Sequence, residues 1–318
     1  MPIFNAVAAA LAWLGRQGTR AVAISVFVGF AVPPLAAWLK PAFTPALAIL
    51  LCLSFLRIAP EEFRAYLKRP GLVIAASLWI MLAIPLLMGL VLRLSGLDAL
   101  APGLFIALML QASAPPLMSS PTFAALLRLD AALALATMLL CTAVIPVTGP
   151  FFAATFVGGA LELSPLALSL RLAALLAGSA CVALVIHRLA GRERIERQHQ
   201  AIDGMSVLAL FVFAVGLMDG ATAALLARPM LVAGLIVGAF ALTLVFGAVT
   251  FVVFSRAGHV RALALALCAG GRNMGLLLAA VGGFVPDLTW LYFALAQFPI
   301  YLAPYLLGPL ARRINSKI

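Results

Sequence analysis

The sequence has little charge and almost no histidine. Only 10% of its 318 residues are Asp, Glu, Lys or Arg, and 3 are His, whereas 65% are hydrophobic. A soluble domain of this length needs a charged surface and cannot bury so much apolar side-chain area. The scarcity of charge therefore excludes a soluble globular fold and predicts that lipid surrounds most of the chain.

The motifs of metal and covalent chemistry are also missing. The four cysteines lie in apolar runs, without the spacing of metal ligands or of a disulfide framework: Cys52, Cys141, Cys181 and Cys268. An intramembrane hydrolase or transferase needs a nucleophile with a base, or a metal cluster. No histidine lies near Ser119 or Ser120 in the sequence, and there is no HExxH motif. We therefore expect neither an enzyme nor a bound metal or other cofactor.

Acidic residues are fewer than basic ones. The chain has 10 Asp and Glu against 21 Lys and Arg, a formal charge of +11. Such an excess can indicate nucleic-acid binding, but here the basic residues form short patches between apolar runs, without interleaved aromatic side chains. Membrane topology explains the charge better, because cytoplasmic loops collect Lys and Arg. We therefore expect the lipid bilayer, and no nucleic acid, as a partner.

Long apolar runs occupy most of the chain. A bilayer core of about 30 Å takes roughly 20 helical residues to cross, which leaves room for about ten helices. The candidate spans are 20–39, 42–57, 70–93, 102–128, 130–152, 164–188, 201–218, 229–254, 260–283 and 288–310. The fold class predicted is an all-α membrane protein with about ten transmembrane helices in a single transporter domain.

The basic residues divide unequally between the two sides of this topology. If the N-terminus is cytoplasmic, only four lie on the outer side: Lys40, Arg93, Arg171 and Arg228. We therefore expect a multi-pass protein of the cell (inner) membrane with both termini cytoplasmic. The stretch Met1–Leu14 has its positive charges after its apolar run, the wrong order for a signal peptide. It is predicted either to lie at the interface or to fuse with the next segment into one long first helix.

The two halves of the chain share features at a nearly constant offset. The interrupted segment 113–121 and the Gly-rich segment 270–273 are separated by about 150 residues. Five spans per half is an odd number, so the second half must be inverted relative to the first. The sequence predicts two inverted repeats, about 20–158 and about 163–312, a layout common in secondary transporters.

Span 4 contains three prolines within seven residues: Pro115, Pro116 and Pro121. Each proline removes a backbone donor and clashes with the preceding turn, so the helix must open here. Opened backbone at membrane depth is tolerated only where protein or a water-filled cavity satisfies its polar groups. Ser119, Ser120 and Thr122 are therefore candidate substrate-binding hydroxyls, and the alternative is that they cap the second half-helix.

Span 9 is interrupted by glycines, with Gly270 and Gly271 just before an arginine. Arg272 lies eleven residues past Arg261, or about 16 Å along a helix, which places it near the bilayer midplane. Every Asp and Glu is expected near a span end or in a loop, so Arg272 needs another polar partner. It either binds substrate or bonds the opened carbonyls of span 4, and Asn273 either contacts substrate or bridges the two breaks.

These motifs resemble the bile acid:sodium symporter family over most of the chain. Gly271-Arg272-Asn273-Met274-Gly275 falls on the family's Gly-x-Gln-Asn-x-Gly pattern, Arg69-Pro70 opens span 3, and 115–130 matches the broken span 4. The resemblance implies that helices 4 and 9 are broken and cross at the centre. It also implies a core subdomain of spans 3–5 and 8–10 that moves against a panel subdomain of spans 1, 2, 6 and 7, with substrate held where they meet.

The chain departs from that family at the sodium ligands. A Ser-Asn pair of sodium-coupled members corresponds to Ser120-Pro121, a Ser and a Thr correspond to Ala134 and Met138, and a Glu and a Gln correspond to Cys268 and Arg272. Sodium is a hard cation that prefers oxygen ligands. We therefore expect neither sodium site to survive, and a guanidinium at the crossing to replace the lost ions.

Together these features predict a secondary transporter that moves a small organic anion by alternating access. A fixed cation, two half-helix N-termini and several hydroxyls favour carboxylates or similar anions. Two alternatives remain open at this point. One is a sodium:organic-anion symporter with relocated sodium ligands, and the other is a membrane sensor or scaffold that binds a ligand without transporting it.

Overall fold

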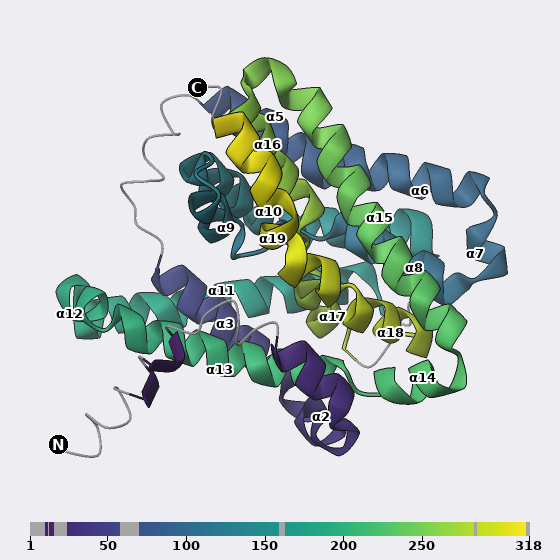
Figure 1. Ribbon diagram of the computed structural model, residues 1–318, viewed down its shortest axis with the longest axis horizontal. Coiled ribbons are helices and arrows are strands. Elements are labelled where there is room, and N and C mark those ends of the chain that lie inside the picture. The colour runs from purple at the N-terminus through teal and green to yellow at the C-terminus, as the bar shows by residue number, and fades with distance from the viewer. Residues whose placement is uncertain are drawn as a thin grey trace. The chain divides into compact units, whose positions relative to one another are not determined.

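The computed structural model describes residues 10–11, 13–15, 24–57, 70–158, 163–282 and 285–315, and these are almost entirely helical (Figure 1). Within them, seven helices are long and apolar enough to cross a membrane: Pro33–Leu56, Pro70–Leu94, Ala131–Val157, Pro165–Ala190, His199–Ala227, Pro229–Ala257 and Asp287–Arg313. The chain is a multi-pass, all-α membrane protein, as predicted. The connection 58–69 and most of the N-terminal stretch Met1–Leu14 lie outside the described residues.

The chain divides into two compact units, each built from two separate stretches of sequence. The first unit comprises Met1–Ile58 and Ala173–Val232, and the second comprises Ala59–Leu172 and Ala233–Ile318. The division falls inside two long helices, α11 (Pro165–Ala190) and α15 (Pro229–Phe254). Each unit has its own packing centre and is described in turn.

The first unit is organised around α13. Its described helices, besides most of α11 and a helix over residues 24–31, include α2 (Pro33–Leu39), α3 (Phe43–Leu56), α12 (Arg192–Arg197), α13 (His199–Leu217) and α14 (Ala221–Ala227). The rings of Phe43 and Phe213 stack at 4.8 Å, and Arg57 pairs with Asp203 at 2.7 Å. Helices α2 and α3 therefore both pack along α13, which buries the apolar faces of all three helices.

The chain reverses direction at Val32, which corrects the predicted boundary between spans 1 and 2. A break near Lys40 was expected, but Pro33–Leu56 forms one apolar helical stretch of 24 residues, with a 3-10 turn at Lys40–Ala42. Val32 instead leaves the helical region, with φ −127° and ψ 74°. A residue before proline avoids helical dihedrals, whereas proline fits the first turn of a new helix. The Pro33-Pro34 pair, and not Lys40, marks the turn.

Contacts along α13 support this reversal. Gly29 lies against Val215 and Met218 near the end of α13, and a β-carbon on Gly204, near its start, would overlap the Leu11 backbone. From Gly29 onward the chain returns along α13 until Arg57 reaches Asp203. Lys40, expected in a loop, therefore lies within a membrane-length helix and pairs with Asp219 at 2.9 Å.

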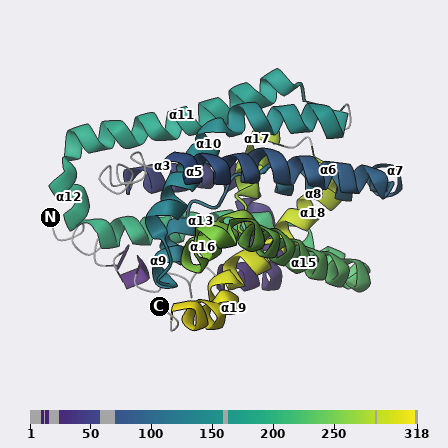
Figure 2. The same cartoon turned by 90° about the horizontal axis from the view of Figure 1, so that it is seen from above.

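The described residues of the second unit include eleven helices. They are α5 (Pro70–Leu78), α6 (Ile84–Leu94), α7 (Leu97–Leu100), α8 (Pro102–Ser113), α9 (Ser120–Leu126), α10 (Ala131–Phe152), α15, α16 (His259–Gly270), α17 (Met274–Val281), α18 (Asp287–Leu295) and α19 (Gln297–Asn315). A π-helical turn, Trp79–Ala83, joins α5 to α6, and the two lie nearly in line in Figure 2. A similar turn, Ala153–Val157, extends α10.

Helix α10 lies at the centre of the second unit. It packs against α5, α9 and α16, and a cluster that includes Val73, Leu133 and Leu265 is buried between these helices. Asp130 caps its first turn by accepting a hydrogen bond from the Leu133 amide at 3.0 Å. This packing fixes the position of the two interrupted helices, α8–α9 and α16–α17.

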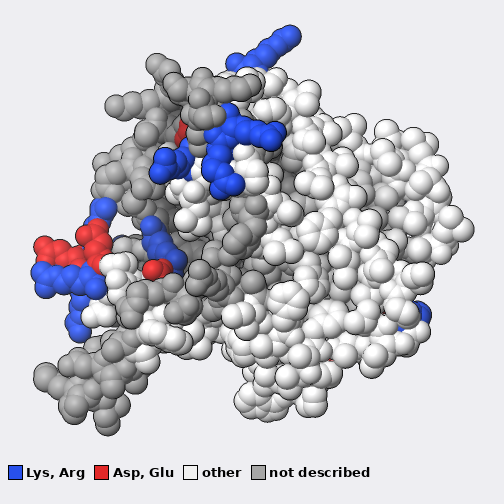
Figure 3. Space-filling view, viewed as in Figure 1, with Lys and Arg blue, Asp and Glu red and all other residues white. Residues whose placement is uncertain are grey.

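Helix α15 shows the character of a lipid-facing span. It contains no Asp, Glu, Lys or Arg, and its length is free of charged side chains in Figure 3. Its outward-facing side chains include Val237, Leu244 and Val252, which are 67%, 54% and 69% exposed. Exposing such an apolar strip to water would cost free energy, whereas lipid acyl chains can cover it without that cost.

Gly216 is the position at which the packing of the first unit can be tested. A β-carbon there would lie 2.9 Å from the Leu39 carbonyl oxygen, a contact that backbone cannot relieve cheaply. We expect Gly216→Ala to destabilise the protein by about 1–3 kcal/mol, because it overpacks a helix crossing. The measurement is the melting temperature in detergent. Gly234→Ala in α15, where a β-carbon meets nothing within 4 Å, is the matched control and should leave it unchanged. Equal shifts for the two variants would contradict the close crossing.

Candidate functional site

The two helix interruptions of the second unit meet each other. Helix α8 ends at Ser113 and α9 begins at Ser120, while α16 ends at Gly270 and α17 begins at Met274. The Leu117 amide donates to the Gly271 carbonyl at 3.0 Å, and the Asn273 amide donates to the Pro115 carbonyl at 2.8 Å. Residues 114–119 and 271–273 thus form a short antiparallel bridge, which we call the break junction. Each break satisfies backbone groups that the other leaves open.

Proline and glycine residues determine where the spans α8–α9 and α16–α17 are interrupted. Ala114 precedes Pro115 and is extended, with ψ 148°, because a residue before proline is pushed out of the helical region. Pro116 pairs across the bridge, and Pro121 lies in the first turn of α9, where proline is tolerated. Gly270 ends α16 where a β-carbon would lie 2.8 Å from the Thr243 carbonyl oxygen. The close approach of α16 to α15 therefore requires a glycine at this position.

Arg272 fills the break junction and is completely buried. Its Nε–H donates to the Ala269 carbonyl at 2.7 Å, and its Nη1 donates to the carbonyls of Ala114 at 2.8 Å and Ile80 at 3.2 Å. These three acceptors belong to three separate spans. A planar fork of five N–H donors can hold such acceptors at once, which a lysine ammonium on a flexible stem does less well.

The Ile80 carbonyl is available because the span that carries it is not a regular α-helix. Ile80 lies in the π-helical turn Trp79–Ala83, and Pro85, which has no amide hydrogen, follows in the first turn of α6. A π-turn disturbs the regular pairing of backbone groups and occurs often at functional sites. Sequence reasoning missed this acceptor, although Pro85 inside an apolar run was a signal of irregular backbone.

The charge of Arg272 is balanced by dipoles and an aromatic ring rather than by an anion. Its guanidinium carbon lies 5.3 Å from the centre of the Phe246 ring on α15. Among the described residues, no carboxylate lies within ion-pair distance of Arg272, and its Nη2 has no hydrogen-bond partner. The site is therefore a fixed, incompletely compensated cation in a low-dielectric interior.

The other predicted site residues lie around this cation at different depths. Ser120 is fully buried, and its hydroxyl has no partner, whereas Thr122, two residues later on another face of α9, is exposed. Ser119 occupies the N-cap position of α9 but makes no capping hydrogen bond through its side chain. Asn273, 8% exposed, precedes α17 and bridges the two breaks through its backbone amide. In this conformation the accessible candidates are thus Ser119 and Thr122.

Four of the residues that the sequence analysis compared with sodium ligands are buried: Ser120, Ala134, Met138 and Cys268. The Cys268 thiol points to the Ala134 carbonyl at a donor–acceptor distance of 3.9 Å, and the Met138 sulfur accepts from the Thr142 hydroxyl at 3.8 Å. At these four positions the side chains offer sodium one oxygen ligand, the Ser120 hydroxyl. No group of three or more His, Cys, Asp or Glu side chains that could hold a metal ion occurs within the described part of the chain.

A second buried polar contact of this unit was not predicted as such. The Tyr292 hydroxyl on α18 donates to the Gln111 side-chain oxygen on α8, and both side chains are buried. Thr289, one turn earlier, donates to the Gly103 carbonyl at 2.7 Å. These bonds fix the first half of the interrupted α8–α9 span against α18, so they support the break junction from one side.

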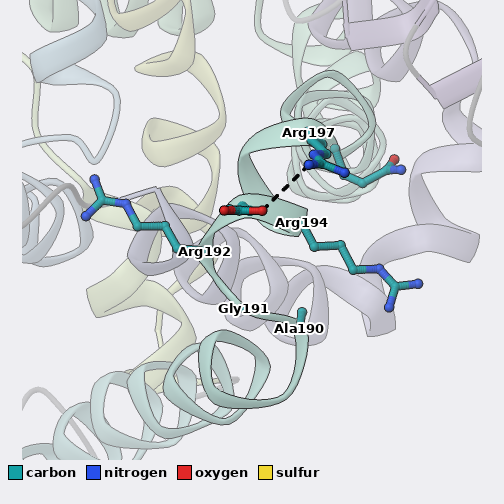
Figure 4. Close-up of a pocket in the computed structure, with 7 residues that line it drawn as sticks. Ala190, Gly191, Arg192, Arg194 and Arg197 are labelled. Atoms are coloured by element: carbon teal, nitrogen blue, oxygen red, sulfur yellow. Dashed lines mark ion pairs between the residues drawn. The ribbon is translucent and has the colours of Figure 1, made fainter.

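A surface hollow in the first unit is a different kind of site. It has a volume of about 600 Å³ and is lined by residues 190–194, 197 and 198 at the connection of α11 to α12. Figure 4 shows Arg192, Arg194 and Arg197 projecting in different directions, with Arg197 paired to Glu193 at 3.6 Å. Both partners of that pair are at least 80% exposed, so water screens them. The hollow offers no buried polar group comparable with Arg272.

Comparison with known proteins adds no assignment to this geometry. No protein-family model matches the sequence, and no curated protein matches it either. The chemistry of the break junction therefore rests on its own residues.

Replacement of Arg272 by lysine tests its role at the break junction. One ammonium cannot reach carbonyls on three spans in the geometry of the guanidinium, so Arg272→Lys should cost at least about 3 kcal/mol of stability. The measurement is the melting temperature of the purified protein. Arg261→Lys is the matched control, because Arg261 is half-exposed and lies 3.5 Å from Asp130, and it should change stability by less than about 1 kcal/mol. A melting temperature for Arg272→Lys equal to that of the control would exclude the three-span role.

Proposed function

We propose that this protein is a secondary transporter of a small organic anion that works without sodium. The observation that carries the proposal is the completely buried Arg272, which bonds carbonyls on three spans where two interrupted helices meet. Interrupted helices that pair at membrane depth are typical of secondary transporters, in which opened backbone surrounds the substrate site.

The lack of sodium coupling follows from what surrounds the cation. A sodium ion beside Arg272 would place two positive charges in one low-dielectric site, without a carboxylate to offset them. Cys268 and Ala134 occupy the positions where the resembling family has hard ligands, and they bond each other instead. We propose that the guanidinium does permanently what bound sodium does in that family, namely hold the opened spans together.

The sign of the substrate follows from the same charge. A cation that no carboxylate offsets produces a positive potential around the break junction, and low-dielectric walls extend it. The hydroxyls of Ser119 and Thr122 and the amide side chain of Asn273 can donate hydrogen bonds to a carboxylate. In this arrangement Arg272 and Ser120 act from the buried side, and Ser119, Thr122 and Asn273 contact the substrate.

The proposed architecture has ten spans in two inverted repeats, with both termini cytoplasmic in the inner membrane. In this proposal the ten passages are the seven membrane-length helices, the interrupted pairs α8–α9 and α16–α17, and a first span that includes the helix of residues 24–31. The two compact units are the proposed panel and core subdomains. Alternating access needs bodies that keep their internal contacts while they move, and each unit has its own core and hydrogen bonds.

Independence from sodium is tested by thermal unfolding. The melting temperature of the purified protein in detergent is measured while sodium chloride replaces choline chloride at constant ionic strength. A bound ion stabilises by RT ln(1 + [L]/Kd), so absence of a site predicts a flat response. A saturating rise specific to sodium would instead favour symport with relocated ligands.

The sign of the substrate is tested with matched pairs of small molecules. Butyrate and butylamine, and benzoate and benzylamine, have similar shapes and opposite charges, and we expect only the carboxylates to raise the melting temperature. The carboxylate that stabilises the protein most is then used to measure flux into proteoliposomes. Thr122→Val and Asn273→Ala should each weaken its apparent affinity about tenfold, because each variant removes one hydrogen bond to the charged substrate. Gly234→Ala, on the lipid-facing α15, serves as control and should transport normally. Binding without flux would identify a sensor rather than a transporter.

A further inference from the structure

The buried polar atoms without partners all belong to the unit that contains the break junction. Within the described residues, five buried side-chain nitrogen or oxygen atoms have no hydrogen-bond partner: Ser77 Oγ, Ser120 Oγ, Thr137 Oγ1, Thr243 Oγ1 and Arg272 Nη2. Each belongs to the second unit, and none belongs to the first. Such atoms are rare because each costs free energy when it is buried unpaired. Their concentration in one unit indicates an additional group that the side chains bind.

Hydrogen bonds within the second unit connect Arg272 to the segments that carry the other hydroxyls. Ser77 lies one turn before Ile80, whose carbonyl accepts from Arg272 Nη1, and Ser120 begins α9 directly after the break junction. The Cys268 thiol, one turn before Arg272, points to the Ala134 carbonyl on α10. Thr137 is one turn after Ala134 and so lies on the same face of α10.

This cluster offers donors and a positive charge. Nη2 carries two N–H groups, and each of the three hydroxyls can turn its hydrogen towards a common acceptor. The guanidinium charge lies in the protein interior, with no carboxylate among the described residues within ion-pair distance. A group that accepts hydrogen bonds and carries one negative charge satisfies both requirements, whereas water satisfies only the first.

We infer that the second unit binds one small monovalent inorganic anion, chloride in the first instance, between Arg272 Nη2 and the hydroxyls of Ser77, Ser120 and Thr137. The anion must be small because all four side chains are at most 5% exposed. It is distinct from the organic substrate, which has to enter and leave. The inference depends on the break junction and not on the proposed transport function.

The test is a chloride titration in the absence of sodium and of added substrate. The full-length protein is purified in detergent without chloride, and its melting temperature is measured while choline chloride replaces choline gluconate at constant ionic strength. A second series starts from choline sulfate, so that a response to the reference anion is recognised. We expect a saturating rise in both series, and bromide should replace chloride.

Two conservative variants and a matched control assign the response to this cluster. Ser120→Ala and Thr137→Val each remove one hydroxyl that has no other partner, and either should raise the chloride midpoint about tenfold. Ser179→Ala removes a buried hydroxyl of the first unit, which donates to the Ala48 carbonyl at 3.2 Å. It should lower the melting temperature and leave the chloride midpoint unchanged.

A melting temperature that does not depend on chloride in either series would overturn the inference, and so would a midpoint that Ser120→Ala and Thr137→Val leave unchanged. A bromide peak beside Arg272 in anomalous diffraction would confirm it directly, and crystals grown in bromide without such a peak would contradict it. The sodium titration proposed above holds chloride constant, so failure of the anion site and failure of the proposed function give different results.

Discussion

The fold of the second unit depends on how opened backbone is satisfied away from water. An interrupted span leaves amides and carbonyls unpaired, and in hydrocarbon each such group costs several kcal/mol. Here two interruptions pair with each other, and the side chain of Arg272 binds three further carbonyls. The arginine therefore completes the hydrogen bonding of spans that could not otherwise remain open at this depth.

That arrangement requires several local features to coincide. Pro115 forces Ala114 into extended dihedrals and so exposes its carbonyl, and the π-turn at Ile80 presents a second acceptor. Gly270 lets α16 approach the α15 backbone closely enough for Phe246 to reach the guanidinium. Each of these residues is ordinary alone. Together they let the buried guanidinium of Arg272 contact four spans, which offsets the cost of burying its charge.

Much of this could be predicted from the sequence, for physical reasons. Proline removes a backbone donor wherever it occurs, so the interruption after Ser113 followed directly, and Arg272 had to seek carbonyls because no Asp or Glu falls near the same depth. The sequence did not reveal that Ile80 supplies one of the carbonyls that bind Arg272, because an apolar run is compatible with both an α-helix and a π-turn. The turn at Val32 was missed because the charge of Lys40 was taken to mark the boundary between spans 1 and 2. A charged side chain on a membrane-length helix can, however, stay solvated or paired.

A guanidinium differs from a sodium ion in one respect that determines the energetics of transport. Sodium dissociates, and its gradient can therefore be coupled to the substrate, whereas the Arg272 charge is covalently attached and does not leave. If the protein transports without sodium, the free energy for transport comes only from the substrate gradient and from the gradients of anions that exchange with the solution. The same permanence would keep the proposed substrate site positive in every conformation. A transporter built in this way favours exchange of one anion for another, because the empty site retains an uncompensated charge that makes its reorientation unfavourable.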